Sequence, residues 1–288
     1  MSQRPRWPSG RALTRLTLYR SADGRSLEKI GDIAHSLTSL GLTVHHDQGQ
    51  DVLLISSMVS LPLALGPTLP PLHSAAVVAI TTTDLLHFGA RFYSLDDRLA
   101  VVDSQIDSVP SGAADSNLEL TTWIRTGGLG ANPVTLSGVH PVVTAPLNKS
   151  GKMGPPSLIF SAAWLADPVR VGPFLYYTAF PPSQRPAVVI ARAQDGAYQE
   201  ISRLEGLTVP HVWRDGARWR LLAHGPGVGG HLTVVERESA DGLAWSLPAP
   251  VLPFTDIREC ESPVAAAFRG GYVLACSART GSHAARPP

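Results

Sequence analysis

The sequence predicts an all-β protein, specifically a five-bladed β-propeller with four antiparallel strands in each blade. Short runs rich in β-branched and aromatic residues are bounded by Gly, Pro, Asp and Ser, and convincing helical periodicity is nearly absent. The 288 residues include 26 glycines and 25 prolines but only 16% charged residues, which suits many tight turns between largely buried strands. A repeated turn phrase with the spacing of propeller blades is the third observation.

The strand signals follow one another along the whole chain. The clearest runs are 52–56, 77–81, 118–124, 174–178, 187–190, 218–222, 232–235 and 272–277. Residues 27–40 have the composition of either a helix or a strand, and Gly31 within the segment favours the strand.

The repeated phrase is an extended segment, a small polar turn centred on an aspartate, and another strand. The turn aspartates are Asp23, Asp84, Asp195 and Asp241. The gap between Asp84 and Asp195 is about twice the others, which predicts one degenerate copy near 135–143 and therefore five blades. A second hairpin, rich in Tyr, Trp and Leu in its later strand, recurs at 167–177, 210–222 and 261–274.

The two ends of the chain complement each other. The strand pair at 16–23 and 27–32 has no inner pair before it, and the inner pair near 261–277 has no outer pair after it. We therefore expect the last blade to be closed by N- and C-terminal strands, which protects sheet edges. The prediction is one propeller domain over 13–280, with flexible tails at 1–12 and 281–288.

Composition also excludes classes of function. A net charge of +1 without a dense basic stretch is not typical of nucleic-acid binding. No run of about 18 uncharged apolar residues predicts a transmembrane helix, and no apolar secretory segment follows the N-terminus, so the expected location is the cytoplasm.

The two cysteines are expected to be free. If the last hairpin places Val264 opposite Cys276, an extended chain puts Cys260 about 13 Å away, at about 3.3 Å per residue, which is too far for a disulfide. The histidines and cysteines do not have zinc-site spacing, so no metal ion or other cofactor is expected.

Three phrases carry a resemblance to known enzymes. They are Asp-Pro-x-Val before a Tyr-Tyr strand, Ser-Ala-Asp-Gly-x-x-Trp, and Glu-Cys-Glu-Ser-Pro-Val before Gly-Gly-Tyr-Val-Leu. From about Leu13 to Ser277 the chain resembles the five-bladed propeller glycosidase superfamily of arabinanases, β-xylosidases, invertases and levanases. The resemblance implies two aspartates and a glutamate at the starts of innermost strands, around a central funnel that binds a small-molecule substrate.

The candidate site residues follow from that placement. The candidate catalytic residues are Asp103, Asp167, Glu261 and His211, and the candidate substrate-binding residues are His46, Trp164, Glu259 and Arg258. His211 stands where the resemblance implies an acid in the blade after Asp167, and the glutamates come one blade later. The structural alternatives are an aspartate that only begins a strand, a hydrogen-bonded core histidine, a solvated strand end at His45 and His46, and tryptophans that pack between blades.

Three functions therefore remain open. The first is a glycosidase-like enzyme in which carboxylates supply acid and base. The second is a non-hydrolytic cyclase or isomerase that folds an apolar small molecule in the funnel, where His211 and one carboxylate move a proton. The third is a binding propeller without catalysis. Aromatic residues make up only 7% of the chain, which favours the second function, whereas the resemblance favours the first.

Overall fold

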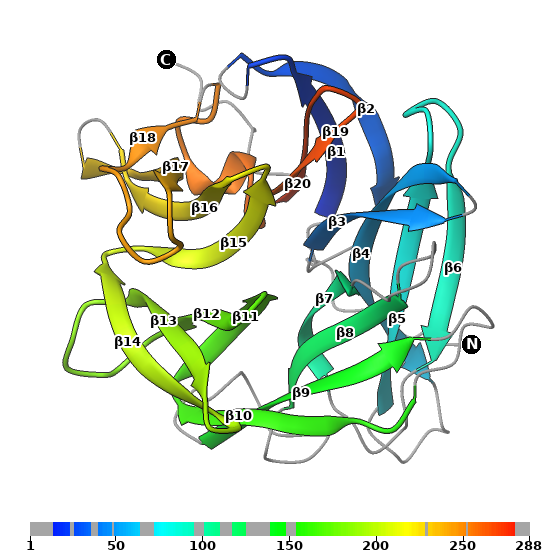
Figure 1. Cartoon of the computed structure of the whole chain (residues 1–288). Coiled ribbons are helices and arrows are strands. Elements are labelled where there is room, and N and C mark those ends of the chain that lie inside the picture. The colour runs from blue at the N-terminus through cyan, green and yellow to red at the C-terminus, as the bar shows by residue number, and fades with distance from the viewer. Residues whose placement is uncertain are drawn as a thin grey trace, which may run out of the picture.

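The computed structural model describes residues 14–23, 26–35, 40–47, 49–63, 72–94, 101–109, 117–124, 139–147, 154–227, 230–251 and 253–279. Five four-stranded antiparallel sheets form a ring (Figure 1). The predicted fold class, a five-bladed all-β propeller, is confirmed.

Each blade is a meander in which the first strand is innermost and contacts the first strands of its neighbours. Blade 1 contains β3 (Leu40–Asp47), β4 (Gln50–Leu63), β5 (Leu72–Thr82) and β6 (Gly89–Ser94). Blade 2 contains β7 (Val101–Val109), β8 (Asn117–Ile124), β9 (Val139–Leu147) and β10 (Ser157–Ala163). Blade 3 contains β11 (Leu165–Val171), β12 (Phe174–Ala179), β13 (Ala187–Gln194) and β14 (Ala197–Glu205). Blade 4 contains β15 (Thr208–Asp215), β16 (Arg218–Pro226), β17 (Leu232–Ser239) and β18 (Ala249–Pro250).

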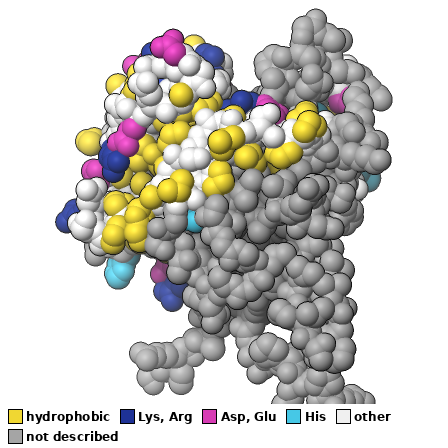
Figure 2. Space-filling view, turned by 90° about the horizontal axis from the view of Figure 1, so that it is seen from below, with side chains coloured by type: hydrophobic (Ala, Val, Ile, Leu, Met, Phe, Trp, Pro, Cys, Tyr) yellow, Lys and Arg dark blue, Asp and Glu magenta, His cyan; other side chains and the backbone are white. Residues whose placement is uncertain are grey.

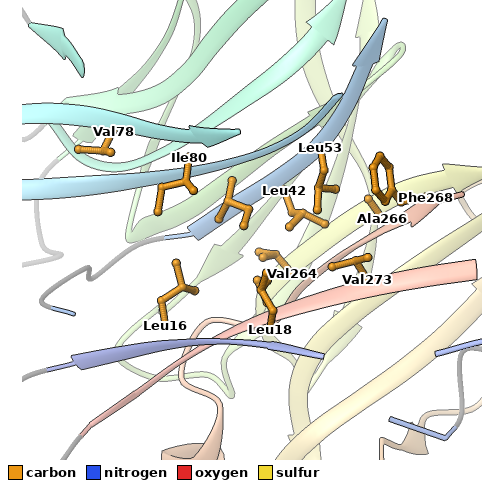
Figure 3. Close-up of a cluster of buried hydrophobic side chains, with 12 residues drawn as sticks. Leu16, Leu18, Leu42, Leu53, Val78, Ile80, Val264, Ala266, Phe268 and Val273 are labelled. Carbon is orange, nitrogen blue, oxygen red and sulfur yellow. The ribbon is translucent and has the colours of Figure 1, made fainter. Parts of the chain in front are cut away.

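Blade 5 joins the two ends of the chain, as predicted. Its strands are β19 (Val264–Phe268), β20 (Gly271–Arg279), β1 (Thr14–Ser21) and β2 (Glu28–His35), in that order. Strands β1 and β20 pair without interruption from Thr14 opposite Arg279 to Ser21 opposite Tyr272. A cluster of buried apolar side chains packs this blade against blade 1 (Figure 3). It includes Leu16, Leu18, Leu42, Leu53, Ile80, Val264, Phe268 and Val273.

The four turn aspartates all lie between the third and fourth strands of a blade. The carboxylates of Asp23, Asp84 and Asp241 accept backbone N–H groups further along their turns, at 2.8–2.9 Å. Asp195 differs, because it and Gly196 have φ of 48° and 83° and form a tight two-residue hairpin turn. The corresponding connection of blade 2 runs from β9 to β10, so the range 135–143 predicted for the degenerate copy is too early and overlaps β9.

The phrase Ser-Ala-Asp-Gly-x-x-Trp packs blade 4 against blade 3. The Tyr176 hydroxyl donates to the Gly242 carbonyl at 2.9 Å, and the Trp245 indole donates to the same oxygen at 3.2 Å. Gly242 has φ of 78°, and a Cβ atom there would lie 2.9 Å from the Tyr176 hydroxyl and 3.1 Å from the Trp219 ring. The turn therefore needs glycine for its conformation and for the contact.

Replacing Gly242 with alanine should destabilise the protein more than the same change at Gly196. Both glycines have positive φ, but nothing lies within 4 Å of a Cβ at Gly196. We expect G196A to lower the unfolding free energy by ~1–2 kcal/mol and G242A by about 2–4 kcal/mol, because overpacking is added to backbone strain. Urea unfolding of the two variants measures the difference, and equal losses would contradict the packing argument.

The boundary between blades 2 and 3 is also apolar. Phe160 of β10 contacts Tyr177 and Tyr198 of blade 3, with ring centroids 5.4 and 6.4 Å apart.

Seen from below, hydrophobic side chains form a band across the described part of the surface (Figure 2). Two hydrophobic residues of the outermost strands are exposed, Leu158 of β10 and Ile201 of β14.

The expectation of free cysteines is wrong, because Cys260 and Cys276 form a disulfide with Cα atoms 4.9 Å apart. Val264 pairs with Ala275 rather than Cys276, and the chain before Val264 is not extended. It forms a 3-10 turn at Ile257–Glu259, and the Glu261 N–H then donates to the Ser277 carbonyl at 2.7 Å. This path returns Cys260 to the side of β20.

The predicted tails at 1–12 and 281–288 lie outside the described residues. In the part of the chain that the structure describes, no helix has the length and apolar character needed to cross a bilayer.

Candidate functional site

Three consecutive innermost strands carry the same irregularity. In β7, β11 and β15 the register shifts so that two residues oppose one residue of the second strand. These bulged pairs are Val102-Asp103, Asp167-Pro168 and Val209-Pro210. β-Bulges re-aim side chains and are frequent next to active sites. The described registers of β3 and β19 run without such a shift.

The bulges of blades 3 and 4 have the same backbone conformation. Asp167 has φ of 51° and Val209 has φ of 54°. Positive φ is uncommon outside glycine and is strained for a β-branched residue such as valine. Proline follows both residues and holds each bulge in an extended continuation. Two strained residues at one level of adjacent innermost strands mark this part of the funnel as the candidate site.

Thr178 connects the two bulges across the blade boundary. Its hydroxyl donates to Asp167 Oδ2 at 3.1 Å and accepts the Val209 backbone N–H at 2.8 Å. The Thr178 side chain is fully buried, whereas Asp167 is half-buried. A hydroxyl fixed by a backbone donor directs its proton to the carboxylate, so Asp167 is held as a hydrogen-bond acceptor. Such a carboxylate can act as a base, as a nucleophile or as an acceptor for a ligand hydroxyl.

The strand registers of blades 3 and 4 show which residue of blade 4 is equivalent to Asp167. Val209, not His211, occupies the place in blade 4 that Asp167 occupies in blade 3. Asp103 occupies the second bulge position of blade 2, which is proline in the next two blades. The side chain of Asp103 lies outside what the structure describes.

His211 is a buried neutral residue. Its Nε2 lies 2.7 Å from the Ala265 carbonyl oxygen, which can only accept, so Nε2 carries the proton. Its ring also stacks on Trp213, with centroids 5.7 Å apart. Burial lowers the pKa of His211 to about 4, against a smaller opposing effect of the hydrogen bond. This environment matches the structural alternative of a hydrogen-bonded core histidine.

His211 should make stability depend on pH. Because its pKa is about 4 in the folded protein and 6.5 ordinarily, the unfolded chain binds more protons between these values. The stability is complete above pH 6.5, and it falls as the pH is lowered towards about 4. His211→Gln keeps a donor for Ala265 without a titrating ring, so its unfolding free energy should fall less over this range. Urea unfolding across the range measures this, and parallel pH profiles would contradict the assignment.

The other candidates lie around the entry to the last blade. Glu259 accepts the Thr255 N–H at 2.7 Å and closes a capping box with Asp256. Arg258 pairs with Asp256 through two hydrogen bonds of 2.9 and 2.7 Å, and this contact lowers the pKa of Asp256 to about 2. Both predicted substrate-binding groups thus have local structural partners. Glu261 is half-buried three residues before β19.

His46 and Trp164 have different surroundings. His46 is exposed at the β3–β4 hairpin, with Nδ1 3.2 Å from Asp51 Oδ1. It lies near the end of an innermost strand, whereas Asp167 lies near the start of one, so the blade arrangement does not bring the two together. Trp164 precedes β11 with φ of 61°, and its carbonyl accepts the Phe180 N–H at 2.9 Å. Within the described residues, no group of three or more His, Cys, Asp or Glu could hold a metal ion.

Sequence reasoning missed Thr178 and Val209. The sequence does contain a signal for Val209, because Asp167-Pro168 and Val209-Pro210 stand at equivalent positions in two similar hairpins. Thr178 has no such signal, because its role depends on a contact with the neighbouring blade.

Solved structures that are similar to this chain include glycosidases. An exo-β-1,3-galactanase from Phanerochaete chrysosporium is 10% identical, with a TM-score of 0.51 over 93% of this chain and 65% of that one. A GH43 protein of the Bacteroides ovatus xyloglucan locus is 12% identical, with a TM-score of 0.50 over 91% of this chain and 50% of that one. A GH43 protein from Bacillus licheniformis is 11% identical, with a TM-score of 0.51 over 85% and 50%.

These likenesses confirm the resemblance at the level of the fold. The chain spans about half to two thirds of the length of these proteins. No model of a known protein family matches the sequence, and no curated protein matches it.

Proposed function

We propose that this protein is a glycosidase-like enzyme that cleaves a small glycoside in the central funnel, with Asp167 as its base or nucleophile. The observation that carries the proposal is the strained, half-buried Asp167 carboxylate held by the Thr178 hydroxyl on an innermost strand. The structural neighbours, which are glycosidases, support the same class of chemistry.

The reaction needs a second group that donates a proton to the leaving oxygen. Glu261 is our candidate, because it is half-buried at the entry to the innermost strand of blade 5. Asp167 would then either activate water or attack the anomeric carbon. The separation of the two carboxyl groups decides the stereochemistry at the anomeric carbon. A separation of about 5–5.5 Å gives retention of configuration, and about 6.5–9.5 Å gives inversion.

A panel of nitrophenyl glycosides tests the proposal. We expect the wild-type protein to release nitrophenol from at least one arabinoside, xyloside or galactoside, and NMR of the first-formed anomer gives the stereochemistry. Absence of release from every member of the panel would overturn hydrolysis as the function.

A second candidate, a cyclase- or isomerase-type enzyme, has one specific observation in its favour. The bulge position of blade 4 that matches Asp167 is occupied by Val209, so blade 4 offers an apolar side chain where blade 3 offers a carboxylate. A substrate with one polar group and an apolar body fits that arrangement. Under this alternative, nitrophenyl glycosides are not hydrolysed, and an apolar alcohol library raises the melting temperature of the wild type but not of Asp167→Asn.

A further inference from the structure

Thr178 has a structural counterpart in each of the next two blades. In each of these blades, regular pairing between the innermost and second strands begins at one residue pair. The residue equivalent to Thr178 lies two residues further along the second strand from that pair. The counterparts are His224 in β16 and Ser277 in β20, and all three side chains are buried. In blades 3 and 4 the side chain at this position contacts the chain of the next blade.

The side-chain contacts at this position are similar in blades 3 and 4. Thr178 contacts the Val209 N–H in the next blade, and His224 Nε2 lies 3.0 Å from the Cys260 carbonyl on the segment entering blade 5. The carbonyl can only accept, so His224 donates the proton. Ser277 differs, because only its backbone oxygen makes the contact: it accepts the N–H of Glu261, on the segment that enters its own blade, at 2.7 Å.

The segment that carries Glu261 is held at further points. The Cys260–Cys276 disulfide links it to β20, and both sulfur-bearing side chains are fully buried. Blade 4 holds the start of the segment through the Thr233 hydroxyl, which donates to the Phe254 carbonyl at 2.8 Å. Glu261 thus follows directly after a residue fixed both covalently and by His224.

We propose that His224 and the Cys260–Cys276 disulfide form a clamp that positions Glu261 at the funnel, as Thr178 positions Asp167. The importance of Glu261 rests on the proposed function, whereas the clamp itself is a property of the fold. His224 is a positioning residue, because it acts through the Cys260 backbone and not on a ligand.

Two variants of His224 separate positioning from simple burial. Gln can donate a hydrogen bond from a similar place, whereas Leu fills the space without a donor. We expect H224L to raise amide exchange at 257–262 by about tenfold or more while the exchange of blade 3 stays unchanged. H224Q should remain near wild type. Unchanged exchange at 257–262 in H224L, or a rise spread evenly over all blades, would overturn the clamp.

The kinetic readout uses whichever nitrophenyl glycoside the wild type hydrolyses. H224L should lower kcat by about tenfold to a hundredfold with little change in KM, and H224Q should restore most of kcat. Normal kcat in H224L despite faster exchange would overturn the positioning of Glu261. An inactive wild type would instead refute the proposed function, and the exchange experiment would still decide whether the clamp exists.

Discussion

Asp167→Asn is expected to lower kcat by about 10²–10⁴-fold, the usual contribution of a positioned base or nucleophilic carboxylate. The substitution keeps the shape of the side chain, and its amide oxygen can still accept the Thr178 hydroxyl. The change therefore removes the charge and basicity while leaving the contact between blades in place. Steady-state kinetics on a nitrophenyl glycoside, with the melting temperature measured alongside, report the effect.

Asp195→Asn is the matched control, because it makes the same chemical change at an exposed rim turn. Asparagine is favoured in a turn with positive φ such as that of Asp195, so activity and stability should both remain at wild-type levels. Equal kinetics for the two variants would contradict the assignment of Asp167. A matching loss in Asp103→Asn would extend the site to blade 2.

The second large effect concerns the disulfide. Replacing Cys260 and Cys276 with alanine removes a cross-link between residues 16 apart, which should lower the unfolding free energy by about 3 kcal/mol. Urea unfolding of the double variant measures the loss under the same conditions as wild type. An unchanged midpoint, or two thiols that titrate in the unfolded wild type without reductant, would contradict the bond.

The disulfide also bears on where the protein folds. Disulfides persist in oxidising compartments and are rare in the cytosol. The cytoplasmic location therefore stays a prediction, and the disulfide is an argument for an oxidising compartment instead. Non-reducing gel analysis of the protein trapped with a thiol-alkylating reagent in its native cells distinguishes the two.

The sequence predicts the fold well because propeller blades repeat. The spacing of Asp23, Asp84 and Asp241 reflects the same turn chemistry in three blades, and the unmatched strands at both ends predict the closed last blade. The sequence predicts the degenerate copy too early in the chain, because the β9–β10 connection of blade 2 contains no aspartate to mark the turn.

The site residues stay predictions. The position of Asp167 before a strand makes it a candidate, but its backbone conformation depends on a bulge that a strand pattern does not reveal. His211 does not stand at the place equivalent to Asp167, because β11 and β15 carry the same bulge and His211 pairs in β15 as Val169 does in β11. Extended geometry for 257–263 does not predict the disulfide, because the chain forms a 3-10 turn at Ile257–Glu259.

The most direct test is a crystal structure of Asp167→Asn with a bound glycoside from the panel. We expect a sugar at the funnel mouth between blades 3, 4 and 5, with a sugar oxygen or a bridging water within about 3.2 Å of the residue 167 side chain. We also expect Glu261 to face the glycosidic oxygen. A sugar bound elsewhere, or in the funnel but away from residue 167, would contradict the account.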